Sequence, residues 1–335
     1  MRHDPILLVG GAGFVGRQTA QHLRKHFPDV PLLIGGRNLA RAEEAAAEIG
    51  NARGVAVDLA KPDLGLGDQP ISALALFFKE DSLGSLRFAQ SRGVPYLSIS
   101  SGIHEVAPEV AAYMLNASAA PVVLGAEWLV GATTIPALEA AKAFATIDDV
   151  RISAIIDEND IGGPATYADM ERLTKMMPAA LSIENGAQVW RSGEEVQTEV
   201  TAVDGTAMPG ELLSPNDVLI LAEATRAPNV TFRLGIGESS SRRRGEPLST
   251  EIIVELTGKS RDGAPLKSTQ AVVHPGGQMP LTGMGVAMLL ERLTGLTGEP
   301  VSAGLYFPSQ LLNAQDYMTR LKATGGEVRN LDGNR

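Results

Sequence analysis

Short apolar runs and amphipathic segments alternate along the first half of the chain. The first apolar run is Ile6 to Val9, and Val15, Thr19, Leu23 and Phe27 follow it at a spacing of four residues. A short apolar run bounded by glycine predicts a buried parallel strand, and a spacing of four predicts a helix. Further apolar runs occur at residues 30–34, 54–59, 71–78, 96–100 and 121–125. This order of elements predicts a doubly wound parallel sheet of the Rossmann type.

The pattern changes near residue 148. Apolar side chains alternate with polar ones from Val150 to Ile156, which is typical of a strand in a sheet with one covered face. We therefore expect an α/β chain of two domains. Residues 1–147 form an N-terminal Rossmann domain, and a C-terminal segment, residues 300–328, packs back on it. Residues 148–299 form an α+β domain built on a mixed or antiparallel sheet.

The second half also contains a hairpin pattern. Residues 250–257 and 265–274 alternate on either side of Arg261-Asp262-Gly263, a sequence typical of a tight turn. The other elements expected near the C-terminus are a helix over residues 281–293, a terminal helix over residues 308–323 and a frayed tail from residue 330.

Glycines follow the first strand at the spacing of a dinucleotide site. Gly11, Gly13 and Gly16 fit the pattern G-x-G-x-x-G between a predicted strand and a predicted helix. The first glycine permits a tight turn, the second lets the backbone approach a pyrophosphate, and the third lets helix and strand pack closely. The residues expected to contact the cofactor here are Gly11, Ala12, Gly13, Phe14, Val15 and Gly16.

The end of the second strand indicates which dinucleotide is preferred. An NAD site usually places a carboxylate there, whereas an NADP site places Arg near the 2′-phosphate. This chain has Arg37 and Asn38 at that point, with Arg41 one helical turn later and no carboxylate. NADP is therefore favoured over NAD, unless both arginines are plain surface residues and selectivity is loose. Asp58, after the third strand, either reaches the adenine edge or only starts a loop.

Polar residues after the fourth and fifth strands are expected beside the nicotinamide. Phe78 and Ser100 are predicted to contact the cofactor, and Lys79 and His104 are candidate proton donors. Glu127 and Tyr167 are further candidates for catalysis, although each of the four side chains also fits a structural role. None of the tyrosines is followed by Lys four positions later, so the catalytic pair of short-chain dehydrogenases is absent.

Composition narrows the class of protein. The 335 residues include no cysteine, which excludes disulfides, cysteine-ligated metal sites and thiol nucleophiles. The histidines show no metal-binding spacing, and we expect no metal. A formal net charge of −10 argues against nucleic acid as a partner. The chain start lacks the apolar region of a signal peptide and no apolar run is long enough for a membrane span, so a cytoplasmic protein with no membrane contact is expected.

Several segments resemble one enzyme family. The run from Ile6 to Gly50, with its glycine turn and its Gly-Gly-Arg-Asn sequence, is similar to the NADP-binding domain of the saccharopine dehydrogenase-like (saccharopine reductase-type) oxidoreductases. Phe88 to Ser100 and Gly304 to Leu312 are similar to later parts of that family. The resemblance implies reduction or oxidation of a secondary amine, formed between an amino acid and a carbonyl compound, with NAD(P)H. The usual Gly-Pro-like turn after the fourth strand is replaced by Phe77 to Asp81, which puts the substrate class in doubt.

These observations together predict an NADP-dependent oxidoreductase. Hydride transfer is expected at a C–N bond, imine or secondary amine, of a small amino-acid-derived substrate. Two alternatives remain open at this stage. The chain is a non-catalytic NADP-binding or redox-sensing protein, or it reduces a C=C or C=O bond on the same scaffold. A sheet-rich second domain often supplies a dimer face, so a homodimer is expected.

Overall fold

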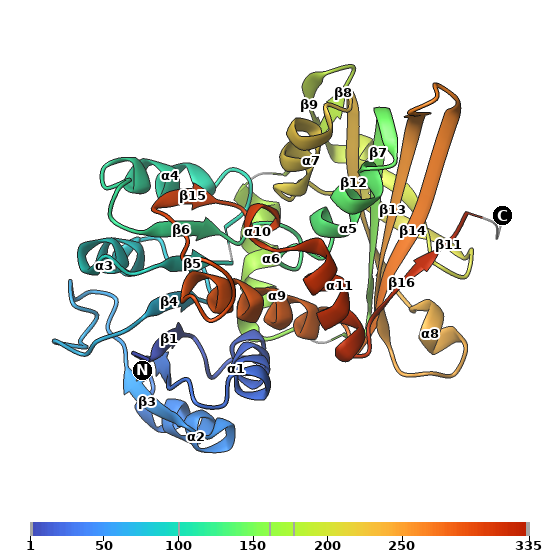
Figure 1. The fold of residues 1–335 in the computed structure, drawn as a ribbon. Coiled ribbons are helices and arrows are strands. Elements are labelled where there is room, and N and C mark those ends of the chain that lie inside the picture. The colour runs from blue at the N-terminus through green and yellow to red at the C-terminus, as the bar shows by residue number, and fades with distance from the viewer. Residues whose placement is uncertain (1–2, 100, 161, 177, 333–335) are drawn as a thin grey trace. The chain divides into compact units, whose positions relative to one another are not determined.

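The structure is a computed structural model, and it describes residues 3–99, 101–160, 162–176 and 178–332. Residue contacts divide the chain into two units (Figure 1). The first comprises Met1–Ala126 and Thr282–Leu312, and the second comprises Glu127–Leu281 and Asn313–Arg335.

The first unit is built on a parallel sheet of seven strands. Its strand order is β15-β6-β5-β4-β1-β2-β3, and every neighbouring pair is parallel. The apolar runs of the sequence form these strands because they are covered on both faces, and all four residues of β1 are buried. The strands are β1 (Ile6–Val9), β2 (Leu32–Gly36), β3 (Ala52–Ala56), β4 (Ala73–Leu76), β5 (Tyr96–Ser98), β6 (Pro121–Leu124) and β15 (Gly304–Tyr306).

Helices connect the parallel strands of the first unit. Leu86 and Phe88 of α3 pack with the sheet residues Leu74, Leu76 and Tyr96 in one buried apolar cluster. The helices are α1 (Phe14–His26), α2 (Leu39–Ile49), α3 (Gly84–Arg92), α4 (Val106–Met114), α9 (Gln278–Leu293), whose first turn belongs to the second unit, and α10 (Pro308–Leu311). In the described part of the chain, no helix has both the length and the apolar character that crossing a bilayer requires.

The strand order reverses at β1, which lies between β2 and β4. The last residues of the neighbouring strands are in register: Val9 pairs with Gly35 and with Leu76, and Leu76 pairs with Ser98. The segments that follow these four strands therefore begin at the same edge of the sheet. In open α/β sheets, ligands bind at this carboxyl edge, where the strand order reverses.

The second unit is built on a mixed sheet of nine strands. Its main path is β10-β11-β12-β7-β13-β14-β16, and β8 pairs with β12 and with β9. β7 and β12 are parallel, and the other described pairs are antiparallel. The strands are β7 (Phe144–Asp157), β8 (Ala179–Glu184), β9 (Ala187–Ser192), β10 (Gln197–Thr201), β11 (Ala207–Leu212), β12 (Asn229–Gly237), β13 (Ser249–Ser260), β14 (Pro265–Pro275) and β16 (Glu327–Asn330).

Short helices accompany this sheet. They are α5 (Thr134–Ala141), α6 (Pro164–Met176), the 3₁₀ helix η1 (Gly193–Val196), α7 (Asp217–Thr225), α8 (Ser240–Arg243) and α11 (Ala314–Ala323). The predicted fold class is confirmed: a doubly wound parallel sheet is joined to a second unit on a mixed sheet. The predicted hairpin is also present as β13 and β14.

The structure differs from the expected boundaries at two places. The first unit ends at Ala126 instead of residue 147, because α5 packs with α7 in the second unit. The expected helix over residues 308–323 is two helices, since Oδ1 of Asn313 accepts hydrogen bonds from the amides of Gln315 and Asp316 and begins α11 there.

As a result, only part of the segment 300–328 joins the parallel sheet. β15 pairs with β6, whereas α11 belongs to the second unit and buries Tyr317 and Leu321. The predicted frayed tail is also partly ordered. Residues 327–330 form β16 against β14, and the carboxylate of Asp332 accepts a hydrogen bond from the amide of Thr269 at 2.6 Å.

Candidate functional site

The turn after β1 requires glycine at two of the motif positions. A Cβ atom at Gly11 would lie 2.7 Å from the carbonyl oxygen of Leu8, and one at Gly16 would lie 2.5 Å from Cα of Gly11. Gly10 has a φ of +87°, and the amide of Gly13 donates to its carbonyl at 2.9 Å. The backbone therefore closes a tight turn, and α1 packs directly on it. The predicted contacts Gly11, Ala12, Gly13, Phe14, Val15 and Gly16 all lie in this turn or in the first turn of α1.

The N-terminus of α1 is open to an anion. Gly13 is the N-cap residue in an extended conformation, no side chain caps it, and the first turn holds no acidic residue. A Cβ at Gly13 would meet only the carbonyl of Gly10, at 3.2 Å. The first amides of a helix without a cap, together with the helix dipole, form a natural binding site for a phosphate group.

Arg17 fixes this turn to the neighbouring helix. Its Nε donates to the carbonyl of Ala12 at 3.2 Å, and its Nη1 is hydrogen bonded to Glu48 near the end of α2. This arrangement could not be predicted from the sequence, because Arg17 and Glu48 are 31 residues apart and meet only when α1 and α2 pack. Arg17 thereby holds the backbone of the glycine turn in place.

The side chains of Arg37 and Arg41, which follow β2, are exposed. Oδ1 of Asn38 accepts a hydrogen bond from the amide of Arg41 at 3.1 Å and so caps α2, as its position in the sequence indicates. Within the described residues, the guanidinium groups of Arg37 and Arg41 form no hydrogen bond or ion pair. Asp58 is engaged locally, since it accepts a hydrogen bond from the amide of Ala60 and lies 3.9 Å from Nζ of Lys61. That arrangement fits a loop-start carboxylate.

The segment after β4 lies against the glycine turn. A Cβ at Gly10 would be 3.0 Å from Cδ1 of Phe78, so the Phe78 ring lies directly beside this turn. Glu80 is buried, and its carboxylate accepts hydrogen bonds from the amides of Gly84 and Ser85 at the start of α3. Glu80 thus caps α3. Within residues 77–81, where the sequence departs from the pattern of the resembled family, Glu80 therefore has a clear structural role.

Lys79 lies in a polar cluster at the same edge. Its Nζ is 3.4 Å from Oγ of Ser101 and 4.0 Å from Oε1 of Glu109 on α4. Ser101 Oγ donates to Oε1 of Glu109 at 2.5 Å, and Ser98 Oγ donates to Oε2 at 3.2 Å. The side chains of Lys79 and Glu109 are only 11% and 4% exposed. The sequence indicated Lys79 but missed Glu109, which follows no strand and is brought in by α4.

Burial sets the acidity of this cluster. It raises the pKa of Glu109 above its ordinary value, while hydrogen bonds from Ser101 and Ser98 and the charge of Lys79 act in the opposite direction. Burial, with a smaller effect of the Glu109 charge, also raises the pKa of the neighbouring Tyr96. Glu109 is therefore a carboxyl group that holds its proton more tightly than a surface glutamate does.

The remaining candidates are His104, Ser100, Glu127 and Tyr167. His104 is half-buried in the turn before α4, and its buried Nε2 has no hydrogen-bond partner among the described residues. Ser100 lies outside the described residues. Glu127 and Tyr167 belong to the second unit: Glu127 is buried, and Tyr167, on α6, is 59% exposed.

Glu127 instead belongs to a buried acidic pair. Thr134 Oγ1 donates to Glu127, and Oδ2 of Asp217, at the start of α7, accepts a hydrogen bond from the amide of Trp128 at 2.7 Å. Burial, and next the charge of Glu127, raise the pKa of Asp217 to about 8. Oδ1 of Asp217 has no partner in the described part of the chain. These contacts show Glu127 buried with Asp217 inside the second unit, and its catalytic role stays a prediction.

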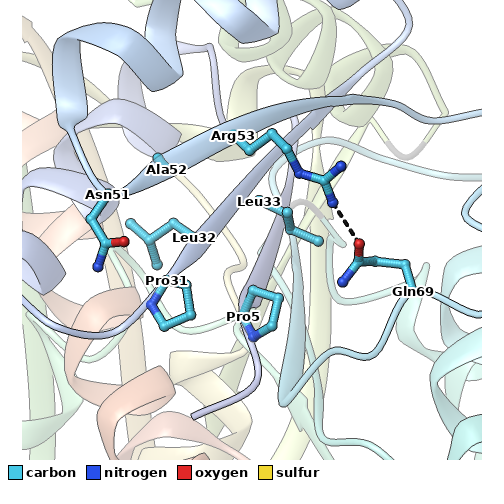
Figure 2. Close-up of a pocket in the computed structure, with 8 residues that line it drawn as sticks. All are labelled: Pro5, Pro31, Leu32, Leu33, Asn51, Ala52, Arg53 and Gln69. Atoms are coloured by element: carbon cyan, nitrogen blue, oxygen red, sulfur yellow. Dashed lines mark hydrogen bonds between the residues drawn. The ribbon is translucent and has the colours of Figure 1, made fainter. Parts of the chain in front are cut away.

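A pocket of about 300 Å³ lies at the opposite edge of the parallel sheet (Figure 2). Its lining residues include Pro5, Pro31 and Asn51, which directly precede β1, β2 and β3. Arg53 Nη2 donates to Oε1 of Gln69 at 2.5 Å across its rim. Because the glycine turn follows β1 at the carboxyl edge, this pocket is separate from the candidate dinucleotide site.

Comparison with solved structures supports the fold assignment. Saccharopine dehydrogenase (L-Glu forming) from Saccharomyces cerevisiae matches with a TM-score of 0.66 and 14% identity, over 98% of this chain and 100% of that chain. Homospermidine synthase from Legionella pneumophila, solved in complex with NAD, matches with a TM-score of 0.65 and 12% identity, over 100% of this chain and 94% of that chain. This chain has the saccharopine dehydrogenase fold.

In this chain, the glycine turn and the Lys79 cluster lie at the carboxyl edge of the parallel sheet. The fold expected from the sequence resemblance is thus confirmed over the whole chain, at an identity that by itself establishes only the fold. No protein-family model matches the sequence, and a search of curated proteins finds no match.

Proposed function

We propose that the first unit binds a nicotinamide dinucleotide and that the protein is an oxidoreductase. The observation that carries this proposal is the glycine turn at the reversal of strand order, with an uncapped α1 behind it. The pyrophosphate fits the amides that follow Gly13, because a side chain there is absent and the helix end is free of acidic residues. The similar homospermidine synthase was solved in complex with NAD, which agrees with this site.

We further propose that NADP(H) is preferred over NAD(H). The side chains of Arg37 and Arg41 are exposed, their guanidinium groups bind no described group, and both residues follow the strand whose end faces the adenosine ribose in this fold class. A guanidinium binds phosphate through paired, charge-assisted hydrogen bonds, whereas a carboxylate at this position would repel it. The residues between β2 and α2 include no carboxylate.

The proposed reaction is hydride transfer at a C–N bond of a small amino-acid-derived substrate. When bound, the dinucleotide supplies or accepts the hydride, and the protein has to orient the substrate and manage one proton. Lys79 is the candidate for that proton, since it follows β4 at the edge where the nicotinamide is expected. An imine carbon is already electrophilic, so the protein needs only to position the imine beside the hydride donor and to supply one proton.

Residues 77–81, where the sequence departs from the pattern of the resembled family, bear on the alternative of a protein that binds NADP without catalysis. In the structure, Glu80 caps α3 and Lys79 joins the polar cluster with Ser101 and Glu109. That segment is thus organised around a buried amine, which favours retained chemistry. Reduction of a C=C or C=O bond at the same site differs from imine reduction only in the substrate, so substrate panels are needed to distinguish the two. We also propose that the protein is a homodimer, which sedimentation of the purified protein tests directly.

The cofactor assignment is tested by fluorescence titration of NADPH and NADH. The double variant Arg37→Ala/Arg41→Ala is expected to weaken NADPH binding by at least about tenfold and leave NADH binding unchanged, since only NADPH carries the extra phosphate. Arg53→Ala is the matched control, an exposed arginine at the opposite edge of the sheet. Tighter NADH than NADPH binding by the wild type would refute the preference. Oxidation of NADPH is then followed with panels of imines, enones and ketones, and turnover of the imines alone supports the C–N assignment.

A further inference from the structure

Three side chains form a continuous polar path beneath the carboxyl edge of the first unit. Lys79 follows β4, Ser101 lies a few residues after β5, and Glu109 reaches them from α4. Ser101 Oγ is within 3.4 Å of the Lys79 amine and donates to Glu109 at 2.5 Å. The hydroxyl therefore lies between the amine and the carboxyl, at hydrogen-bonding distance from both.

Stability alone gives little reason for this arrangement. The side chains of Lys79 and Glu109 are nearly buried, and the desolvation of two charges offsets most of the attraction between them. Their charged atoms are 4.0 Å apart, so the main link between them is the Ser101 hydroxyl and not a close ion pair. An amine and a carboxyl group joined by a hydroxyl at a ligand-binding edge are suited to moving a proton.

We propose that Ser101 and Glu109 form a proton relay that serves Lys79, with Lys79 as the group that protonates the substrate and Glu109 as a positioning residue behind it. This inference rests on the proposed function. In the reducing direction, the hydride leaves the dihydronicotinamide and forms the new C–H bond, so the cofactor is oxidised and the imine is reduced. The substrate nitrogen takes a proton from the Lys79 ammonium group.

The relay then restores the starting state of Lys79. The Ser101 hydroxyl gives its proton to the neutral amine and takes one from the Glu109 carboxyl group, which solvent later reprotonates. Burial raises the pKa of Glu109 above its ordinary value, which favours the protonated carboxyl form that donates in this step. The groups that act on Glu109 are Lys79, Ser98 and Ser101, which favour its ionised form, and Glu105, which opposes it. Tyr96 lies close enough to be affected by the Glu109 charge.

The coupling is tested first without any substrate. Infrared difference spectra between acid and alkaline pH give the carboxyl band of Glu109, identified by its loss in Glu109→Gln. Removing the nearby cation with Lys79→Met is expected to move the titration of this band to higher pH by about one unit or more. Ser101→Ala is expected to move it in the same direction, because a hydrogen bond to the ionised form is lost. A titration that is unchanged in both variants overturns the relay.

Turnover gives the second test, with 2-methyl-1-pyrroline as the cyclic imine probe and NADPH as reductant. Ser101→Ala and Glu109→Gln are each expected to lower kcat at least about tenfold, to increase the solvent deuterium isotope effect and to leave NADPH affinity unchanged. Formate is expected to restore part of kcat in Glu109→Ala, which a purely structural role would not produce. Glu80→Gln is the matched control, a buried carboxyl beside Lys79 that caps α3, and its kcat and isotope effect should equal those of the wild type.

The outcomes separate the relay from the function on which it rests. Wild-type protein that binds no NADPH or reduces no imine defeats the proposed function, and the infrared titrations then still decide whether Lys79 and Glu109 are coupled. Wild-type turnover with an unchanged kcat and isotope effect in both Ser101→Ala and Glu109→Gln overturns the relay and leaves the function intact.

Discussion

The buried carboxyl group of Asp217 is expected to make the stability of the protein depend on pH. Asp217 is fully buried at the start of α7, and burial together with the Glu127 charge raises its pKa to about 8. In the unfolded chain an aspartate has a pKa of about 3.9. Between these two values the native state keeps a proton that the unfolded state releases, so stability falls as the pH rises from about 4 to about 8.

The size of this effect follows from the pKa difference. Each unit corresponds to about 1.4 kcal/mol, so at pH 7 the burial of Asp217 lowers the free energy of unfolding by about 4 kcal/mol relative to strongly acidic solution. Asp217→Asn removes the titration and keeps an oxygen that can accept the hydrogen bond from the Trp128 amide. The variant should therefore be more stable than the wild type by several kcal/mol at pH 8, and the gain should vanish below about pH 4.

Urea denaturation followed by tryptophan fluorescence measures this gain. The chain has two tryptophans, Trp128 and Trp190, and both belong to the second unit that contains Asp217. Asp204→Asn is the control of opposite sign, since its hydrogen bond with Arg243 holds the pKa of Asp204 well below its usual range. That variant should be less stable than the wild type at both pH 4 and pH 8, and the loss should shrink only as the pH falls well below 4. A gain for Asp217→Asn that is the same at pH 4 and pH 8, or a loss at pH 8, would refute the reasoning.

Three further variants test the first unit. Gly16→Ala should abolish NADPH binding and lower the melting temperature, because its Cβ would lie 2.5 Å from Cα of Gly11; binding with native affinity would contradict the close packing of turn and helix. Arg17→Ala should weaken NADPH binding several-fold in fluorescence titration, with the Arg53→Ala protein as reference, since the carbonyl of Ala12 loses its donor. Glu80→Gln should cost about 1–2 kcal/mol in thermal unfolding while NADPH affinity stays the same, because the charged cap of α3 is weakened and the glycine turn is untouched.

The parallel sheet could be predicted from the sequence because its determinants are local. The apolar run at Ile6 to Val9, the glycines after it and the cap at Asn38 each specify structure within a few residues. The division near residue 126 could not be predicted in the same way. It depends on α5 packing with α7, whose residues are about eighty positions later in the chain, and neither helix carries a signal for the other.

The same distinction applies to the candidate site. Lys79 follows a clear strand, and the rule that ligands bind at the carboxyl ends of strands was enough to select it. Glu109 lies in the middle of α4, at a position where an isolated helix would expose a glutamate to solvent. Its burial arises from contacts with Ser98 and Ser101, which only the folded sheet brings together. A buried charged residue on a helix is visible in the structure and leaves no periodic trace in the sequence.

The loop between β6 and α5 contains two consecutive residues with a strained backbone conformation. Leu129 and Val130 both have positive φ values, +49° and +57°, which a β-branched residue such as valine rarely adopts. Such a conformation costs on the order of 1–3 kcal/mol per residue and persists only where the surroundings impose it. Here the amide of Trp128 is held by Asp217, Val130 is buried, and the amide of Val130 donates to the carbonyl of Glu127. The acidic pair and the strained loop therefore depend on each other, since the carboxyl group that is costly to bury is also the one that holds the loop in place.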